Sequence, residues 1–264
     1  MQKIITVSII LVILFLASFI HAKDIIVPLD NYPPFQILPE NGSPPYGEVI
    51  SILKAIVDNV NQKNGYDLRL VFTKDTPFKR CLGMMQSGKA DLIGGILDKD
   101  DRKGYMHLLK YKLNSNKMFL LRKDEPKDFQ TLEDLSGYSV GTVLGYSYFK
   151  EFDANPKIKK DLARNLLLSL EKLKNKRFDV VICSEAEWEA LKENNLKLAS
   201  NFKPATLKYS WPNPVHIGIS KKSWLGRSNY LQAFEKSVQE MYNNKEFLKI
   251  IDHFYQSYGP RLKK

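Results

Sequence analysis

Short apolar runs alternate with longer amphipathic stretches in the part of the chain that follows the N-terminal segment. The runs at 24–29, 68–72 and 90–96 have the length of buried strands. Between them, apolar residues at helical spacing predict helices over 49–60 and 78–87. The order strand, helix, strand, helix, strand is typical of a parallel α/β arrangement with right-handed crossovers.

The same alternation continues through the rest of the chain with a different sequence. Strands are expected at 117–122, 138–143, 178–183, 206–209 and 216–220. Amphipathic helices are expected at 160–174 and, broken near Asn243–Asn244, at 224–255. Two α/β lobes explain this series better than one, with the last helices returning to the first lobe.

The first 22 residues have the order of a secretory signal peptide. Lys3 precedes an apolar run over 4–20, and the small residue Ala22 stands before the charged pair Lys23–Asp24. A basic start, an apolar stretch and a small residue predict cleavage after Ala22, so that residues 1–22 form the signal peptide. An uncleaved membrane anchor is the alternative, because the apolar run is only slightly shorter than a spanning helix.

The charge balance is strongly basic. The 264 residues include 40 Lys+Arg and 29 Asp+Glu, which gives a formal net charge of +11. The lysines between 157 and 176 are interleaved with acids and leucines, and no arginine-rich stripe accompanies them. We therefore expect no nucleic-acid partner, and the positive charge indicates either a mild preference for anionic ligands or plain solubility.

Few residues have the pattern of a catalytic or metal centre. The chain has no P-loop, GxGxxG or HExxH motif, and its two cysteines, Cys81 and Cys183, are too few for a four-thiolate site. Ser147 lacks the second glycine of a nucleophile elbow, because Phe149 stands in its place. We expect no cofactor, no metal and no catalytic residue, and we expect the two cysteines to be separate thiols.

A small set of residues is better suited to binding. Arg102 can hold a carboxylate through two parallel hydrogen bonds, which a lysine could not form. Tyr32 and Phe78 follow predicted strand ends, where open α/β sheets place their ligands. Their aromatic faces would pack on a flat or aliphatic side chain. These residue types indicate a small carboxylate-bearing molecule as the ligand.

With these residues in place, the chain resembles the extracytoplasmic solute-binding proteins of family 3, the polar amino-acid-binding type. The resemblance rests on short motifs in a fixed order, at Tyr32–Phe35, Met85–Ile93, Arg102, Gly141–Gly145, Arg177–Val181 and His216–Lys222. Each motif is weak by itself, and their order and spacing over nearly the whole chain beyond residue 22 carry the resemblance.

The resemblance implies an α/β, two-lobed periplasmic-binding-protein type II fold. Each lobe would be a mostly parallel sheet flanked by helices, with the ligand cleft between the lobes. Lobe 1 would comprise residues 23–113 and 215–264, and lobe 2 residues 114–214. Hinge segments near Leu113–Asn116 and Lys208–Pro214 would let the lobes close on the ligand.

The resemblance also implies roles for single residues. Tyr32 and Phe78 would pack on the ligand, Arg102 would hold its carboxylate, and Ser147 would add a hydrogen bond from lobe 2. Ser184 stands where the family usually has an aspartate that meets the amine of the ligand.

That departure leaves the ligand's amine without an obvious partner. A buried ammonium without an anion is costly, so the ligand is either an amino acid or another carboxylic acid. Glu185, next to Ser184, is a further candidate for the cleft, and Arg80 is an extra cation whose helix turn could reach it.

The implied function is periplasmic binding of an amino acid or a related acid for ABC-type uptake or sensing, without covalent chemistry. The implied partners are this carboxylate ligand and an ABC transporter permease. We expect a monomer in the periplasm of a Gram-negative cell. The alternative is an exported dehydratase-like enzyme on the same fold, which would act on a prephenate-like acid with Glu185 as its acid residue.

Overall fold

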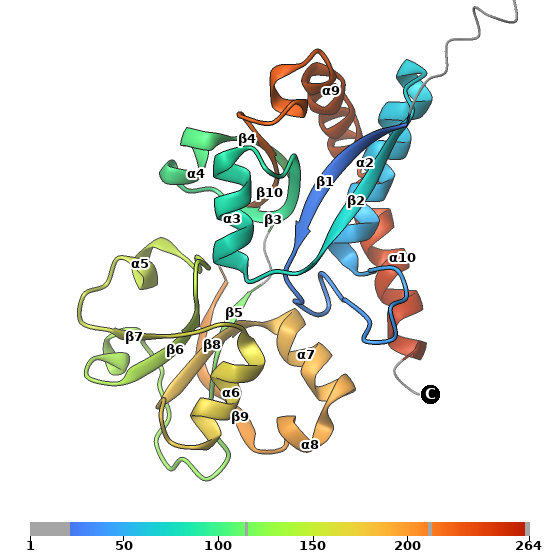
Figure 1. Cartoon of the computed structure of the whole chain (residues 1–264). Coiled ribbons are helices and arrows are strands. Elements are labelled where there is room, and N and C mark those ends of the chain that lie inside the picture. The colour runs from blue at the N-terminus through green and yellow to red at the C-terminus, as the bar shows by residue number, and fades with distance from the viewer. Residues whose placement is uncertain (1–21, 114–115, 211–212, 262–264) are drawn as a thin grey trace, which may run out of the picture.

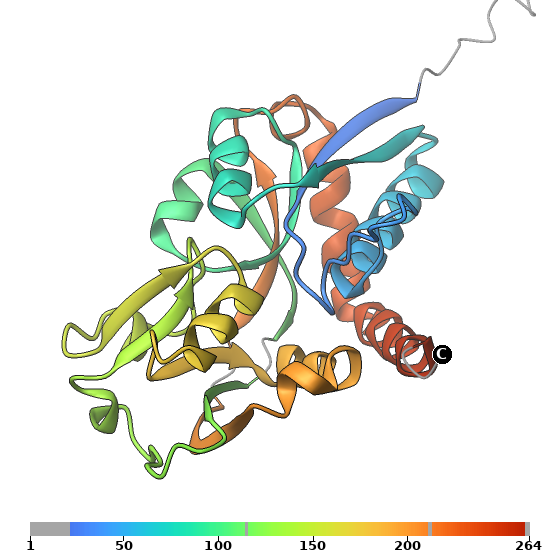
Figure 2. The same cartoon turned by 60° about the horizontal axis from the view of Figure 1, so that its bottom comes forward.

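The computed structural model describes residues 22–113, 116–210 and 213–261. The predicted signal peptide lies outside these ranges except for Ala22, and both predicted hinge segments lie partly outside them. Figure 1 shows the elements in two lobes, one above the other, and Figure 2 shows the same division after rotation. Among the helices in these ranges, none combines the length and the apolar character needed to cross a membrane.

The first lobe combines the N-terminal third of the described chain with its C-terminal part. Its strands are β1 (Lys23–Leu29), β2 (Leu68–Asp75), β3 (Leu92–Leu97), β4 (Met106–Leu113) and β10 (Pro214–Ser220). Its helices are α2 (Glu48–Asn64), α3 (Phe78–Ser87), α4 (Asp100–Tyr105), the 3-10 turn η2 (Leu225–Arg227), α9 (Tyr230–Asn243) and α10 (Glu246–Arg261).

The second lobe is built from the middle of the chain. Its strands are β5 (Lys117–Arg122), β6 (Ser139–Val143), β7 (Lys159–Ala163), β8 (Val180–Ser184) and β9 (Phe202–Tyr209). Its helical elements are the 3-10 turn η1 (Glu133–Leu135), α5 (Lys150–Asp153), α6 (Leu166–Lys174), α7 (Glu185–Asn194) and α8 (Leu196–Ala199). The two lobes and their α/β content confirm the predicted fold class.

The sheets are mixed, which corrects the expectation of mostly parallel strands. In the first lobe β1 pairs with β2 in parallel, whereas β10 lies between β3 and β4 and is antiparallel to both. In the second lobe β6 is parallel to β7 and β8, whereas β5 is antiparallel to β8 and β9. The antiparallel pairs thus involve β5 and β10, the first strand after each passage of the chain between the lobes.

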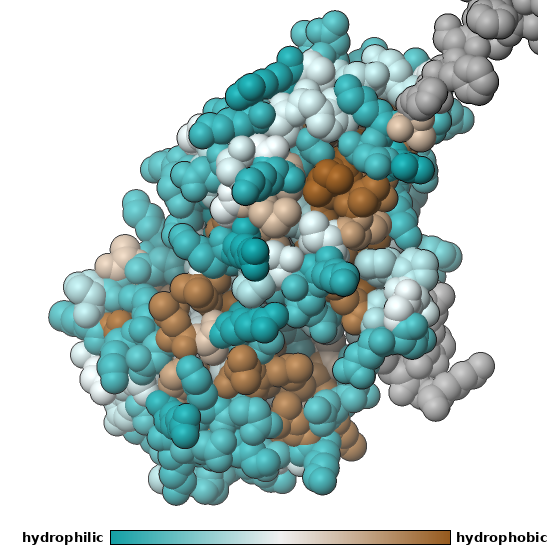
Figure 3. Space-filling model, in the orientation of Figure 1, coloured by the Kyte–Doolittle hydropathy of each residue, from teal (hydrophilic) through white to brown (hydrophobic). Residues whose placement is uncertain are grey.

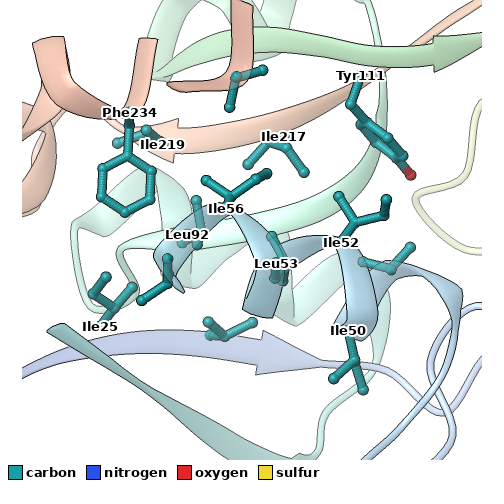
Figure 4. Close-up of a cluster of buried hydrophobic side chains, with 14 of the residues drawn as sticks. Ile25, Ile50, Ile52, Leu53, Ile56, Leu92, Tyr111, Ile217, Ile219 and Phe234 are labelled. Carbon is teal, nitrogen blue, oxygen red and sulfur yellow. The ribbon is translucent and has the colours of Figure 1, made fainter. Parts of the chain in front are cut away.

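The predicted apolar face of α2 forms the centre of the first lobe. Ile50, Leu53, Ile56 and Val57 are all nearly inaccessible, with exposures of 0–3%. They pack in one cluster with residues of β1, β3, β10 and α9, and Figure 4 shows this cluster. Each fully buried side chain of this kind contributes about 1.5–3 kcal/mol to stability, so the helix is held by packing and not by propensity alone.

Two predictions about elements need correction or completion. The stretch 160–174 was expected to be one helix, but its first part belongs to the edge strand β7. Helix α6 begins only after Asn165. The Asn165 side chain caps this helix by accepting a hydrogen bond from the Leu168 amide at 3.0 Å. Strand β4 was not expected. The last helices do return to the first lobe, where α9 packs on α2 and β4.

The surface is largely hydrophilic, and Figure 3 shows apolar side chains in one patch over β1 and β2 of the first lobe and in several places over the second lobe. Large exposed hydrophobic residues of this lobe include Leu144, Leu162, Leu167 and Leu168, on β7, α6 and the turn after β6. Cys81 and Cys183 are both buried and free, as expected.

Candidate functional site

A cavity of about 70 Å³ lies between the lobes, and both lobes form its walls. The first lobe contributes, among others, Asp30, Tyr32, Phe78, Arg102 and Lys112, and the second lobe contributes Lys117, Tyr146, Ser147 and Tyr148. A water molecule needs about 10–15 Å³ on this measure, so there is room for about five waters. The cleft is therefore narrow and already lined closely by the protein's own side chains.

Arg102 is a buried cation that bridges the lobes. It lies on α4, just beyond the end of β3, and is 3% exposed. Its Nη1 donates to the Leu97 carbonyl at 3.0 Å within the first lobe. Its Nη2 donates across the cleft to the Gly145 carbonyl at 3.0 Å and to the Ser147 hydroxyl at 3.4 Å.

No acid of the described residues forms an ion pair with Arg102, although the charges of Asp101 and Asp153 act to raise its pKa. The buried Nε of Arg102 has no hydrogen-bond partner among these residues. Burial accordingly lowers the pKa of the guanidinium from its ordinary value, although it remains charged. A buried charge without a counter-ion is costly, and an anionic ligand would remove that cost.

Three aromatic rings form one wall of the cavity. Tyr146 of the second lobe packs edge-on against Tyr32 with 5.1 Å between ring centroids, and against Phe78 with 4.9 Å. Tyr32 and Phe78 are the rings expected to receive the ligand. The described structure therefore places a tyrosine of the protein itself against both of them.

Asp30 is the acid of the cavity wall, and it is 5% exposed. It follows β1 at the carboxyl end of the strand. Burial raises its pKa to about 7, with a further increase from the charge of Asp75 and a partial decrease from the hydrogen bond of Tyr146. The Tyr146 hydroxyl donates to Asp30 Oδ2 at 3.4 Å, so the one acid in this wall is already in contact with a second-lobe side chain.

Lys112 of the first lobe also lines the cavity, but its charge is satisfied. Its Nζ pairs with Glu48, the first residue of α2, which is only 2% exposed. The other carboxylate oxygen of Glu48 accepts a hydrogen bond from the Tyr255 hydroxyl at 3.0 Å. This pair is a structural contact between β4, α2 and α10.

Lys117 lies at the second-lobe side of the cavity beside a buried acid. It begins β5, opposite Ser184, and is 7% exposed. Burial lowers its pKa, and the negative charge of Glu187 opposes this decrease. Burial likewise raises the pKa of Glu187. The charge of Lys117, two hydrogen bonds from Ser184 and one from the Tyr32 hydroxyl act in the opposite direction and lower it.

Several residues predicted for the site do meet at the cavity. Tyr32, Phe78, Arg102 and Ser147 all line it, although they come from four separate segments of both lobes. The spatial convergence supports the expectation that these residues act together, and their role in binding stays a prediction.

Ser184, Glu185 and Arg80 do not line this cavity. Ser184 is the N-cap of α7 and forms a capping box, in which its hydroxyl accepts from the Glu187 amide at 3.3 Å and its own amide donates to the Glu187 carboxylate at 2.7 Å. The hydroxyl also donates to that carboxylate at 2.7 Å. Glu185 is half-exposed and accepts from Asn116 Nδ2 at 3.0 Å. Arg80 is exposed on α3. Helix capping and the direction of a helix face explain why these side chains point elsewhere.

Sequence reasoning missed Asp30, Lys117, Tyr146 and Glu187. Asp30 could have been found by the rule that identified Tyr32, because it directly follows a buried strand. The spacing Ser184-x-x-Glu187 is a capping-box signature. For Lys117 and Tyr146 the sequence carries no comparable signal, because their positions depend on contacts across the lobe boundary.

The arrangement is suited to binding. Within the described ranges, no group of three or more His, Cys, Asp or Glu side chains could hold a metal ion. The cavity instead offers a guanidinium, aromatic rings and hydroxyl groups, which together can hold a carboxylate and its neighbouring carbons. A two-lobed α/β fold with such an interlobe cavity is typical of proteins that bind a small solute between their lobes.

The chain matches the family of bacterial extracellular solute-binding proteins, family 3, over residues 25–257. It therefore belongs to this family, as its motifs predict, and its class of function is extracellular solute binding. A probable histidine-binding protein of Campylobacter jejuni is 23% identical over 146 residues. That match covers 55% of this chain and 56% of the relative, so it spans little more than half of the relative's length.

Solved structures share the whole fold. An ancestral arginine-binding protein bound to arginine has a TM-score of 0.68 and 25% identity, covering 88% of this chain and 98% of its own. A mutant of the T. maritima protein ArgBP has a TM-score of 0.68 and 20% identity, covering 88% and 95%. A histidine kinase sensor domain with similarity to periplasmic binding proteins reaches 0.69 at 16% identity, covering 88% and 96%. These likenesses confirm the periplasmic-binding-protein type II fold.

Proposed function

We propose that this protein binds a small carboxylate-bearing solute, an amino acid or a related acid, in the cavity between its lobes. The observation that carries the proposal is Arg102, a buried guanidinium that forms no ion pair among the described residues and whose Nε has no hydrogen-bond partner there. A carboxylate in the cavity would supply the missing counter-ion. The names of the relatives, which refer to histidine and arginine, support an amino acid or a molecule of similar polarity.

The other cavity residues would position the ligand around this ion pair. Ser147 would add a hydrogen bond from the second lobe, and Tyr32 and Phe78 would contribute apolar contact. We propose lobe 1 as residues 23–113 and 215–264 and lobe 2 as 114–214, with closure about the two connections between them.

We further propose that residues 1–22 direct export and are removed, and that the protein acts as a monomer in the periplasm of a Gram-negative cell. It would deliver its ligand to an ABC transporter permease or to a receptor. The extracellular class of the family supports an extracytoplasmic location. The histidine kinase sensor domain of similar fold keeps the sensing alternative open.

The proposal includes binding without covalent change of the ligand. A dehydratase needs a positioned acid, and Glu185, the residue considered for that role, makes its contacts outside the cavity. Incubation with prephenate, followed by measurement of the aromatic product by absorbance, tests this point. Product formed in proportion to protein would contradict a pure binding function.

A thermal-shift screen of residues 23–264 tests the ligand class. The panel contains amino acids, small di-acids and aromatic acids. A ligand at a hundred times its dissociation constant stabilises by about 2.7 kcal/mol, which raises the melting temperature by roughly 5–10 °C. We expect a hit among the carboxylates that Arg102→Ala abolishes.

Arg177→Ala is the matched control, because Arg177 is an exposed arginine that does not line the cavity. It should leave the shift unchanged. A ligand that stabilises the Arg102→Ala protein as strongly as the unchanged protein would contradict the assigned role of Arg102. The absence of any shift across the panel, with the protein folded, would contradict a carboxylate ligand.

A further inference from the structure

Tyr146 has a position that the proposed function does not explain. Its ring contacts both Tyr32 and Phe78 at centroid distances of 5.1 and 4.9 Å, and its hydroxyl lies 3.4 Å from the Asp30 carboxylate. A ligand side chain held between the first-lobe aromatic rings would need the same space and the same acid. We define the space bounded by Tyr32, Phe78 and Asp30 as the aromatic slot.

Hydrogen bonds hold the residues on both sides of Tyr146. Arg102 donates to the carbonyl of Gly145 and to the hydroxyl of Ser147, the two neighbours of Tyr146. The Tyr146 amide donates to the Val143 carbonyl at 3.0 Å, and the Val143 amide donates to the Tyr148 hydroxyl at 2.9 Å. These hydrogen bonds therefore hold the segment that carries Tyr146 beside the aromatic slot.

Gly145 allows this segment to approach the first lobe. Its φ of +87° is a left-handed conformation that glycine adopts without strain. A Cβ at this position would lie only 3.3 Å from the Cα of Lys79, at the start of α3. Because the chain lies so close to α3 at Gly145, the next residue, Tyr146, contacts Phe78 of that helix.

We propose that Tyr146 is a specificity-determining residue that fills the aromatic slot and restricts the ligand to short carboxylic acids, which lack a bulky side chain. This inference rests on the proposed function, because it places the ligand's carboxylate at Arg102. The space left beside the slot has a volume of about 70 Å³, which suits an acid of the size of glycine, alanine or lactate. An aromatic or long basic side chain would compete with the Tyr146 ring for its site.

The charges in the cavity agree with a short acid. Of the lining cations, Lys112 is paired with Glu48, and Lys117 lies near Glu187, whereas Arg102 has no acid of its own. Asp30 is the lining acid that could meet a ligand's ammonium, and Tyr146 already contacts it. What remains for the ligand is chiefly one site for a carboxylate.

The test removes the ring and returns it as a free molecule. Tyr146→Ala keeps Cβ and leaves a vacancy that matches phenol, the atoms removed from the tyrosine side chain, and a vacated apolar cavity can bind such a molecule. We expect phenol to stabilise Tyr146→Ala and to leave the unchanged protein unaffected in a thermal-shift assay. Because phenol has no carboxylate, Arg102→Ala in the Tyr146→Ala background should retain this effect.

The second readout is the choice between short and bulky carboxylates, measured by calorimetry. Glycine, alanine and lactate are compared with phenylalanine, tyrosine and arginine. We expect Tyr146→Ala to bind at least one bulky acid at least about tenfold more tightly than the unchanged protein does. Tyr146→Phe keeps the ring and loses the Asp30 contact, and it should keep the preference for short acids.

Each outcome decides between the two proposals. If the unchanged protein binds bulky acids as tightly as Tyr146→Ala does, the ring moves aside and the restriction is wrong, while the proposed function stands. If folded Tyr146→Ala binds neither phenol nor a bulky acid, the slot does not exist. If Tyr146→Phe binds bulky acids as tightly as Tyr146→Ala does, the contact with Asp30 and not the ring sets the preference for short acids, and the inference is overturned.

A failure of the proposed function gives a different result. In that case phenol still binds Tyr146→Ala, but no carboxylate binding depends on Arg102. Circular dichroism and melting confirm that each variant is folded. If Tyr146→Ala does not fold, Tyr146→Leu, which also lacks the ring, is measured in its place against the same ligands with the same expected gains and the same contradicting outcomes.

Discussion

The cavity is lined by two buried cations from different lobes, and their surroundings differ. Arg102 in the first lobe donates to carbonyl groups and a hydroxyl, and no acid of the described residues pairs with it. Lys117 in the second lobe lies near Glu187, which Ser184 holds in place through two hydrogen bonds of 2.7 Å. Neither cation forms an ion pair among the described residues. Neutral groups accept the hydrogen bonds of Arg102, whereas the strongest charge that opposes the burial of Lys117 is that of the buried Glu187.

The difference separates a binding group from a structural one. A cation with its own acid contributes little free energy to capturing an anion, because binding would have to compete with that acid. A cation held only by neutral dipoles is oriented in advance and gains a counter-ion when the ligand arrives. The comparison therefore predicts that the two groups respond differently to substitution.

The largest expected effect is the loss of stability in Glu187→Gln. This change keeps the shape of the side chain and removes the negative charge near buried Lys117, so we expect the free energy of unfolding to fall by about 3 kcal/mol. Urea denaturation measures the difference. The matched control is Glu189→Gln on the same helix, where the acid is 60% exposed and pairs with Lys192 at 2.7 Å. There we expect about 0.5 kcal/mol or less.

Equal and small losses in the two variants would mean that Glu187 does not compensate Lys117. The contrast between the two ends of the cavity would then disappear.

Arg102→Met should have the opposite profile, with a large effect on binding and a small effect on folding. Losing a charged pair of hydrogen bonds to a carboxylate should weaken binding by roughly 100-fold, or about 3 kcal/mol. Removing an uncompensated buried charge should change the free energy of unfolding by no more than about 1 kcal/mol. Calorimetry and urea denaturation of the same preparation provide the two values. A loss of stability as large as that of Glu187→Gln would identify Arg102 as a structural residue instead.

The pH dependence of stability should reveal Asp30. Its pKa is raised by burial to about 7 in the folded protein, compared with about 3.9 in the unfolded chain. The folded state therefore binds this proton more tightly, and the contribution of Asp30 to stability is present below pH 4 and is lost as the pH rises to about 7. The loss should amount to roughly 2 kcal/mol, less than the full shift implies because the carboxyl is not fully buried.

Melting temperatures of the unchanged protein and of Asp30→Asn between pH 4 and 8 measure this effect. Other buried acids, including Glu187, titrate in both proteins, so the difference between the two curves is the quantity to compare. We expect Asp30→Asn to gain stability relative to the unchanged protein as the pH rises. Parallel curves would show that Asp30 has an ordinary pKa.

The smallest expected effect is that of Arg80→Ala. Arg80 is an exposed arginine on α3 and does not line the cavity, in contrast to Arg102. We expect the free energy of unfolding to change by less than about 0.5 kcal/mol, with ligand affinity within about twofold. A large loss of affinity, measured by calorimetry, would show that Arg80 takes part in ligand binding and would weaken the contrast between the two arginines.

Local patterns predicted elements whose limits are set by nearby residues. Helix α3 begins and ends at Phe78 and Ser87 as expected, because Gly88 follows in a left-handed conformation and closes the last turn. Strand β5 also has the expected limits of Lys117 and Arg122. A glycine stop and a short apolar run are signals that need no knowledge of the rest of the chain.

Other elements depend on distant partners. Strand β7 reads as part of an amphipathic helix, yet its residues pair with β6, with Ser139 opposite Lys159 and Val143 opposite Ala163. Neighbouring strands can override a weak helical preference, because pairing satisfies the backbone at an edge of the sheet. The mixed direction of the sheets has the same origin, since pairing partners are chosen in space.

The sequence by itself determined the family, the two-lobed α/β fold and the group of Tyr32, Phe78, Arg102 and Ser147, because each of these follows from residue type and order along the chain. Only the tertiary structure decided that neutral groups accept the hydrogen bonds of Arg102, that Glu187 lies near Lys117, and that Tyr146 contacts both Tyr32 and Phe78. The physical reason is that desolvation and charge compensation depend on which groups from distant segments share a buried volume, and a linear sequence does not specify that volume.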